Sequence, residues 1–100
     1  MDTFWNQIQG KSLLISKLMF DANNKLLEMH VTLEGKKMFM KFINVSQLKI
    51  SNLFSEFLIA GFELIDQINN GWQPENRYYV HDFEQDTISF YCESISGIEI

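Results

Sequence analysis

The sequence has little of several things by which protein classes are recognised. Its 100 residues include one cysteine, one proline and five glycines. A single cysteine cannot close an internal disulfide, so the chain is not a disulfide-stapled scaffold. Scarce proline and glycine, together with the absence of any low-complexity run, argue against a disordered chain or a linker.

Long hydrophobic runs are missing as well. None approaches the roughly 20 apolar residues that a membrane-spanning helix needs, and Met1–Trp5 lacks the basic and apolar stretches of a signal peptide. Asn44, Val45 and Ser46 match the glycosylation triplet, but the match needs a secreted chain. We therefore expect no membrane segment and a cytoplasmic protein.

Positive charge is also scarce. Eight Lys and Arg stand against 13 Asp and Glu, and the net charge is −5. Residues 1–50 hold seven Lys and four acids (+3), whereas residues 51–100 hold one Arg and nine acids (−8). Nucleic-acid binding needs clustered Lys and Arg, so we expect none. The acidic half either attracts a basic protein partner or serves solubility alone.

The sequence is rich in apolar residues. Apolar residues make up 46% of it, with nine Phe and five Met among them. This is enough to fill one core, and a chain of 100 residues leaves no room for a second. We predict a single domain over residues 1–100.

Residues 13–45 predict three antiparallel strands, at about 12–20, 25–33 and 36–43. If Glu34 and Gly35 form the second turn, apolar residues of the last two strands face one another. The predicted apolar pairs are Val31 with Met38, Met29 with Met40, and Leu27 with Phe42. The predicted polar pairs on the other face are Glu28 with Lys41 and Thr32 with Lys37.

The first hairpin fits the same scheme with its loop at Asp21–Asn24. The predicted pairs are Leu18 with Leu27, Leu14 with Val31, and Lys17 with Glu28. One face of the sheet is then apolar, and the other carries a ladder of Lys17, Glu28 and Lys41. Two hairpins that agree on the buried face indicate a sheet, because a one-residue slip moves every side chain to the other face.

The rest of the chain continues in short segments. Residues 2–9 fit a short helix with Phe4, Trp5 and Ile8 on one side. Further strands are expected at 47–51, 61–66, 77–83, 87–93 and around Gly97, with a loop at 69–75, while residues 52–60 fit either a helix or a bent strand. The predicted fold class is all-β: an antiparallel β-sandwich or strongly curled barrel of seven to eight short strands with a short N-terminal helix.

The hairpin of residues 77–93 gives the side chains that a partner could meet. Its second strand alternates between an inward and an outward set: Ile88, Phe90 and Cys92 against Thr87, Ser89 and Tyr91. Two inward sets fit its first strand: Tyr78 with Val80, or Tyr79 with His81 and Phe83. We favour the first set, which leaves Arg77, Tyr79 and His81 on the outer face.

Catalytic and metal-binding motifs are absent: no phosphate-binding glycine loop, nucleophile elbow or zinc-type spacing occurs. His30 is interpreted as covering apolar neighbours, and Cys92 as a buried small side chain. His81 and Asp82 are adjacent on a strand, so they point to opposite faces and cannot share a metal directly. The acids of the nearby turn are interpreted as solvated residues rather than Ca²⁺ ligands: Asp82, Glu84 and Asp86. We predict no enzymatic activity, no cofactor and no metal site.

Trp72 stands out because it lies in the longest polar stretch. A large aromatic side chain on a loop either folds back onto the core or anchors a partner. The predicted partner-binding residues are Trp72, Arg77, Tyr79, His81 and Glu84.

Two segments carry a resemblance. Phe42–Ser46 precedes a short apolar strand, and Arg77–Val80 is followed by Ile88–Glu93. Together with Gly71 and Trp72, these segments resemble small, mostly uncharacterised all-β bacterial proteins, some of which are similar to the immunity proteins of polymorphic toxin systems. The resemblance implies a cytoplasmic, non-catalytic protein that binds and blocks one toxin, and a basic nuclease would suit the acidic half. No site motif of the group can be matched here.

Three functions therefore stay open. The first is a protein-binding module, such as an immunity protein. The second is a small-ligand-binding β-cup, or a small enzyme without a recognisable motif, which needs a pocket of about 300 Å³ or more. The third is a homodimer formed through an edge strand.

Overall fold

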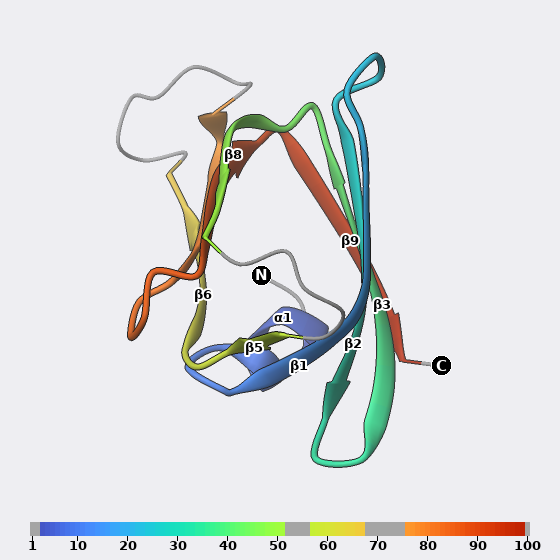
Figure 1. Cartoon of the computed structure of the whole chain (residues 1–100), viewed down its shortest axis with the longest axis vertical. Helices are drawn as coiled ribbons and strands as arrows, with labels where there is room; N and C mark the ends of the chain where they lie inside the picture. The colour runs from blue at the N-terminus through green and yellow to red at the C-terminus, as the bar shows by residue number, and fades with distance from the viewer. Residues whose placement is uncertain (1–2, 52–56, 68–75, 100) are drawn as a thin grey trace.

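The computed structural model describes residues 3–51, 57–67 and 76–99. Within these residues it contains one short helix and nine strands (Figure 1). In chain order they are α1 (Thr3–Ile8), β1 (Leu13–Asp21), β2 (Leu26–Leu33), β3 (Lys36–Ile43), β4 (Ser46–Ile50), β5 (Phe57–Ile59), β6 (Phe62–Asp66), β7 (Tyr78–Asp82), β8 (Ile88–Cys92) and β9 (Ser94–Glu99). The described part of the chain thus holds one or two strands more than the seven to eight expected.

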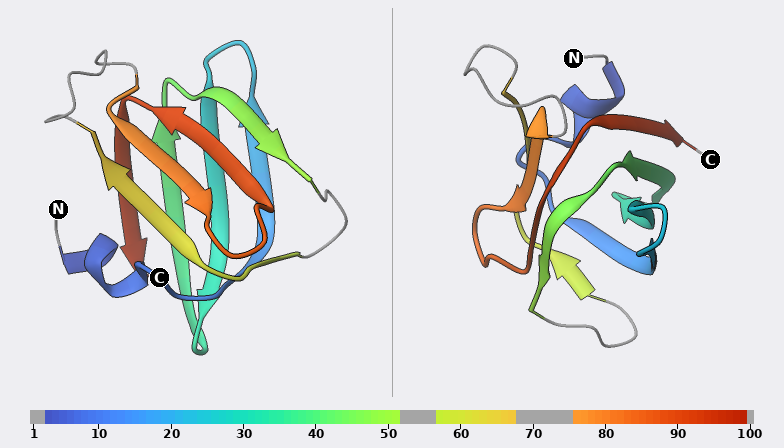
Figure 2. Two further views of the ribbon diagram at one scale, coloured as in Figure 1. Left: turned by 90° about the vertical axis from the view of Figure 1, so that its left-hand side faces the viewer. Right: turned by 90° about the horizontal axis from the view of Figure 1, so that it is seen from above.

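The strands form two antiparallel sheets. The larger sheet has the order β5-β1-β2-β3-β9, and the smaller sheet has the order β4-β8-β7-β6. The two sheets lie as layers, with the smaller one in front in the left view of Figure 2. The all-β sandwich with a short N-terminal helix is therefore confirmed, and the sheets do not close into a barrel.

Two bent chain segments join the sheets at one corner. β3 leads into β4 through Asn44, whose φ of 57° turns the chain, and β8 leads into β9 through Glu93. The two segments stay paired across the corner, since the Glu93 N–H donates to the Ile43 carbonyl at 3.0 Å. β3 pairs with β9 in one sheet and β4 with β8 in the other, so both sheets share this pair of segments.

The predicted register of β2 and β3 is confirmed. Met29 lies opposite Met40, Glu28 opposite Lys41, and the other three predicted pairs form as well. The turn has φ of 51° at Glu34 and 82° at Gly35, which is the pair of positive φ values that a two-residue hairpin turn requires.

The predicted register of β1 against β2 is wrong. The loop begins one residue later than expected, because the Asp21 carboxylate accepts the N–H groups of Asn23 and Asn24 and thereby fixes a turn beyond Asp21. Asp21 consequently pairs with Leu26, and Lys17 lies opposite His30 rather than Glu28. Leu18 keeps its predicted inward face, opposite Met29 instead of Leu27.

A β-bulge at Ser16 then reverses the faces of the residues before it. The register shifts between Ile15 and Lys17, so that Ile15 pairs with Val31. Leu13 and Ile15 are buried, whereas Leu14 is 38% exposed on the outer face, opposite Thr32. The predicted ladder of Lys17, Glu28 and Lys41 does not form, and only its Glu28–Lys41 half is present.

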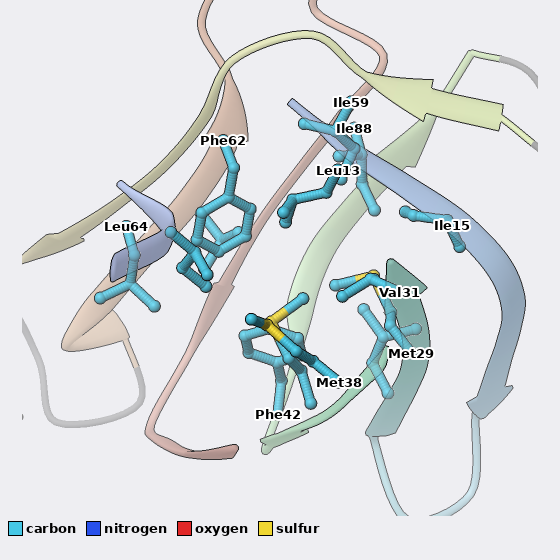
Figure 3. Close-up of a cluster of buried hydrophobic side chains, with 14 of the residues drawn as sticks. Leu13, Ile15, Met29, Val31, Met38, Phe42, Ile59, Phe62, Leu64 and Ile88 are labelled. Atoms are coloured by element: carbon cyan, nitrogen blue, oxygen red, sulfur yellow. The ribbon is translucent and has the colours of Figure 1, made fainter. Parts of the chain in front are cut away.

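Apolar side chains from both sheets fill the space between the layers (Figure 3). Phe42 of the larger sheet and Phe90 of the smaller one meet edge to face, with ring centroids 4.9 Å apart. Met29 and Met40 are both fully buried, as predicted. The core therefore belongs to both sheets at once.

Helix α1 covers one end of this core (Figure 1) and contacts β6 and β9. Trp5 packs against the sheet, 5.9 Å from Phe42 between ring centroids, and is only 2% exposed. Phe4 lies on β9 at Gly97, where a Cβ atom would overlap its ring. The helix thus approaches the strand at a position that only glycine leaves open.

The hairpin of β7 and β8 has the predicted faces. Ile88, Phe90 and Cys92 are buried, and Val80 is fully buried with Tyr78 packed beside it. Thr87 was expected outside but is 8% exposed, because it lies just before β8 and hydrogen-bonds the buried Asp82. Part of the ambiguous 52–60 segment is settled, since β5 is a strand at the edge of the larger sheet.

Candidate functional site on the outer face of the smaller sheet

The outer face of the smaller sheet carries three ring side chains from adjacent strands. Tyr79 and His81 belong to β7, and Tyr91 belongs to β8. Antiparallel pairing puts Tyr79 opposite Tyr91, while on the other side Ile65 of β6 lies opposite Tyr79. We call Tyr79, His81 and Tyr91 the tyrosine–histidine cluster.

The three rings hold one another in place. The Tyr79 and His81 rings stack with centroids 4.8 Å apart and planes 25° apart. The Tyr79 and Tyr91 centroids are 4.7 Å apart. All three side chains are half-buried, so each presents part of its surface to solvent. Rings fixed in this way lose little side-chain freedom when a partner covers them.

A carboxylate orients the histidine. Glu63 on β6 lies opposite His81, and its Oε1 is 2.6 Å from the His81 Nε2. The side chains are 20% (His81) and 43% (Glu63) exposed, so this contact lies at the rim of the cluster. It fixes the imidazole against Tyr79, while the Glu63 side chain stays partly exposed to solvent.

Arg77 lies directly before β7, which begins at Tyr78. Its Nε and Nη2 donate to the two Asp66 carboxylate oxygens at 3.3 and 3.2 Å, and its guanidinium lies 4.9 Å from the centre of the Tyr78 ring. The hydrogen bonds to Asp66 raise the pKa of Arg77, against an opposing effect of burial, so the guanidinium keeps its charge. The positive charge of Arg77 is therefore largely matched within the protein.

The structure brings together some of the predicted binding residues and separates others. Tyr79 and His81 are stacked, and Arg77 adjoins them at the start of β7. Glu84 is exposed in the turn beyond the other end of β7. Trp72 lies outside the described residues.

Sequence reasoning missed two members of this face. The strand alternation placed Tyr91 outward, and its position across from Tyr79 could have been derived from the β7–β8 turn. Glu63 could not be found in this way, because its pairing with His81 depends on the β6–β7 register. No short turn connects those two strands, so no local signal sets that register.

Asp82 corrects the interpretation of the turn acids. It is 1% exposed rather than solvated, and its carboxylate accepts the N–H groups of Gly61, Glu84 and Gln85. Burial alone would raise the pKa of Asp82, but the hydrogen bonds from Thr87 and from these N–H groups outweigh it and lower the pKa. Asp82 therefore holds two turns together, whereas Glu84 and Asp86 are exposed as predicted.

The chemistry of the remaining reactive groups is limited. Burial raises the pKa of the Cys92 thiol to about 12, so the thiol stays protonated at neutral pH and is not a nucleophile. His81 and Asp82 point to opposite faces of β7, as the alternation predicts. Across residues 3–51, 57–67 and 76–99, no three His, Cys, Asp or Glu side chains come together as they would to hold a metal ion.

Charge around the cluster is mainly negative. Glu84, Asp86 and Glu93 are exposed at the ends of β7 and β8, and Glu63 lies beside the rings. Lys49 on β4 lies opposite Ser89, which itself lies opposite His81, so a lysine is also present on this face. The outer face of the smaller sheet is thus an aromatic surface bordered by carboxylates.

Comparison with protein-family models, with curated proteins and with solved structures finds no match to this chain. In the described part, no helix has the length and hydropathy to cross a membrane.

Proposed function

We propose that this protein is a non-catalytic binding module that recognises a basic protein through the outer face of its smaller sheet. The observation that carries the proposal is the tyrosine–histidine cluster, with its stacked rings and its border of carboxylates. An immunity protein that neutralises a basic toxin is the form of this function that fits the resemblance of Phe42–Ser46 and Arg77–Val80.

The composition of the face supports protein binding. Tyrosine is enriched at the centres of interfaces, where a few aromatic residues provide most of the binding energy. Tyr79 lies between Tyr91 and His81 and so forms the centre of the cluster. A partner that covers Tyr79 would also reach the carboxylate of Glu63, which suits lysine or arginine on the partner.

The test is co-purification with the product of a neighbouring toxin-like gene, followed by an affinity measurement on purified proteins. Tyr79→Ala is expected to weaken binding at least about 10-fold, the effect of losing a central aromatic residue. Phe39→Ala is the matched control. It removes an aromatic residue that contacts His30, with centroids 5.0 Å apart, on the outer face of the other sheet.

Equal loss in the two variants would show that the cluster is not the binding surface. A chain that purifies alone, with no toxin-like neighbouring gene, would remove the immunity function itself. Binding through the cluster should also weaken as salt is raised, because exposed charges are screened.

The small-ligand alternative has a specific location among the described residues. Apolar side chains of the described residues pack between the two sheets, which argues against a ligand cup inside the sandwich. A hollow on the outer face of the larger sheet, lined by residues of β1, β2 and β3, has the required size.

Self-association through an edge strand is the other form that protein binding can take. β5 and β9 end the larger sheet, and β4 and β6 end the smaller one. An edge strand can pair with a second copy. The edge of β6 is already covered, because Phe62 exchanges backbone hydrogen bonds with Gly10 and Lys11. Sedimentation velocity that finds a monomer at every concentration would exclude this form.

A further inference from the structure

A hollow of about 350 Å³ lies on the outer face of the larger sheet, across β1, β2 and β3. This face points away from the smaller sheet (Figure 1), so the hollow is remote from the tyrosine–histidine cluster. Five of its lining residues belong to that outer face: Ser16, Lys17, His30, Thr32 and Lys37. Val31 and Met38 complete the lining, and their side chains lie on the buried face of the same strands.

The β-bulge at Ser16 lies in the wall of the hollow. The extra residue interrupts the ladder between Ile15 and Lys17, and the Ser16 hydroxyl donates to the His30 carbonyl at 3.2 Å. Lys17 on β1 lies opposite His30, and Lys37 on β3 lies opposite Thr32, so the two lysines stand on the two strands that flank β2. β-bulges frequently redirect side chains next to binding sites.

The charge of the hollow is unbalanced. Two lysines line it, and no carboxylate does. The ion pairs found in residues 3–51, 57–67 and 76–99 are Arg77 with Asp66 and His81 with Glu63, so neither Lys17 nor Lys37 has an acidic partner there. Lys41, one row further along the same face, differs because it lies opposite Glu28.

We propose that this hollow binds the phosphate group of a small molecule. The two lysines of the lining lie on the strands that flank β2, and together they carry the charge that balances a doubly charged phosphate, for which lysine is a common ligand. Thr32 and His30 lie between the two lysines and add a hydroxyl and an imidazole for hydrogen bonds. The volume of about 350 Å³ leaves space for an attached organic group, and it falls at the small end of ligand pockets.

The experiment is an NMR titration of the ¹⁵N-labelled chain at constant ionic strength. One arm uses inorganic phosphate, a second uses phenyl phosphate, and sodium chloride serves as the reference. We expect saturable shifts confined to the amides of Ser16, Lys17, His30, Thr32 and Lys37. If phenyl phosphate binds more tightly, the natural ligand is an organic phosphate; if the two bind equally, it is the free ion.

The variants separate a site from general attraction of anions. Lys17→Gln and Lys37→Gln should each weaken binding at least fivefold, whereas Lys41→Gln should change it less than twofold. These lysines are on the surface, and the spectrum of each variant reports directly whether the fold is kept.

Shifts that fail to saturate, or that are equally large at Lys41 and Lys49, would overturn the proposal, as would full binding by Lys17→Gln. The proposal does not rest on protein binding by the smaller sheet. Tyr79→Ala should leave the phosphate titration unchanged, so the two hypotheses fail separately.

Discussion

At the scale of single residues, Asp82 does more for the smaller sheet than its position in a hairpin turn suggests. Its Oδ1 accepts N–H groups from Gly61 on one side and from Glu84 and Gln85 on the other. These donors come from the β5–β6 connection and from the β7–β8 turn. One buried carboxylate therefore ties together two segments that are about 20 residues apart, as the separation of 21 between Asp82 and Gly61 shows.

Replacing Asp82 should destabilise the fold in a pH-dependent way. Asp82→Ala leaves several N–H groups without a partner, at a cost of about 2–4 kcal/mol at pH 7. The pKa of Asp82 is lowered in the folded state from 3.8, so its contribution is complete above about pH 4 and is lost as the pH falls through the lowered pKa.

Urea denaturation at several pH values measures this effect. Asp82→Asn keeps the shape but does not titrate, so its stability deficit relative to the wild type should shrink as the pH falls below about 4. A deficit that stays constant down to pH 2 would contradict the assignment.

Gly97 is a second residue whose role is visible only in the folded chain. A Cβ there would collide with the Phe4 ring, so Gly97→Ala should cost about 1–3 kcal/mol by displacing the helix. A double-mutant cycle with Phe4→Ala checks the cause, since removing the ring should make Gly97→Ala nearly neutral. Ser96→Ala is the control on the same strand, and an additive cycle would rule out the collision.

At the scale of elements, sequence reasoning succeeds where turn and alternation agree. The β2–β3 hairpin was predictable because the Glu34–Gly35 turn and both faces give the same register. β1 was not, because its register depends on how the Asp21 side chain fixes the loop and on the bulge at Ser16. Neither the loop geometry nor the bulge can be predicted from the pattern of apolar residues in β1 alone, without knowing how its partner strand pairs.

The candidate site divides in the same manner. The outward positions of Tyr79 and His81 follow from alternation along β7, which the structure confirms. The pairing of His81 with Glu63 does not follow from alternation, because β6 and β7 are joined by a connection longer than a hairpin turn. The contact between Glu63 and His81 is a product of long-range pairing.

The bulge in β1 has a direct test in two neighbouring residues. Ile15→Asp places a charge in the core, where Ile15 is 1% exposed, and should cost about 4 kcal/mol or more. Leu14→Asp lies on the outer face and should cost about 1 kcal/mol. Thermal and urea denaturation of both variants measure the difference, and the opposite order would restore the unbulged register.

At the scale of the whole molecule, one core serves both sheets. Met40 is fully buried at the centre of the larger sheet, and Phe42 on the same strand meets Phe90 of the smaller one. Unfolding of one sheet would therefore expose the apolar side chains of the other. We expect the two sheets to unfold as one cooperative unit.

Met40→Asp tests this cooperativity. A charge at the shared core should remove most of the about 5–15 kcal/mol of stability of a small domain and unfold both sheets together. Lys41→Ala, on the solvent-facing side of the same strand, should lower the free energy of unfolding by less than about 1 kcal/mol. Denaturation of the wild-type chain, followed by far-ultraviolet circular dichroism and by tryptophan fluorescence, should give coincident transitions. Two separate transitions would show that the sheets unfold independently.

The pairing of β3 with β9, which begins at the corner, also has a kinetic consequence. Met38 pairs with Glu99 and Ile43 with Ser94, which are 61 and 51 positions apart in the chain. Such pairing requires closing a long loop before any contact repays the lost entropy. A chain of this high contact order should refold in milliseconds to seconds, and the β2–β3 hairpin should form well before the corner does.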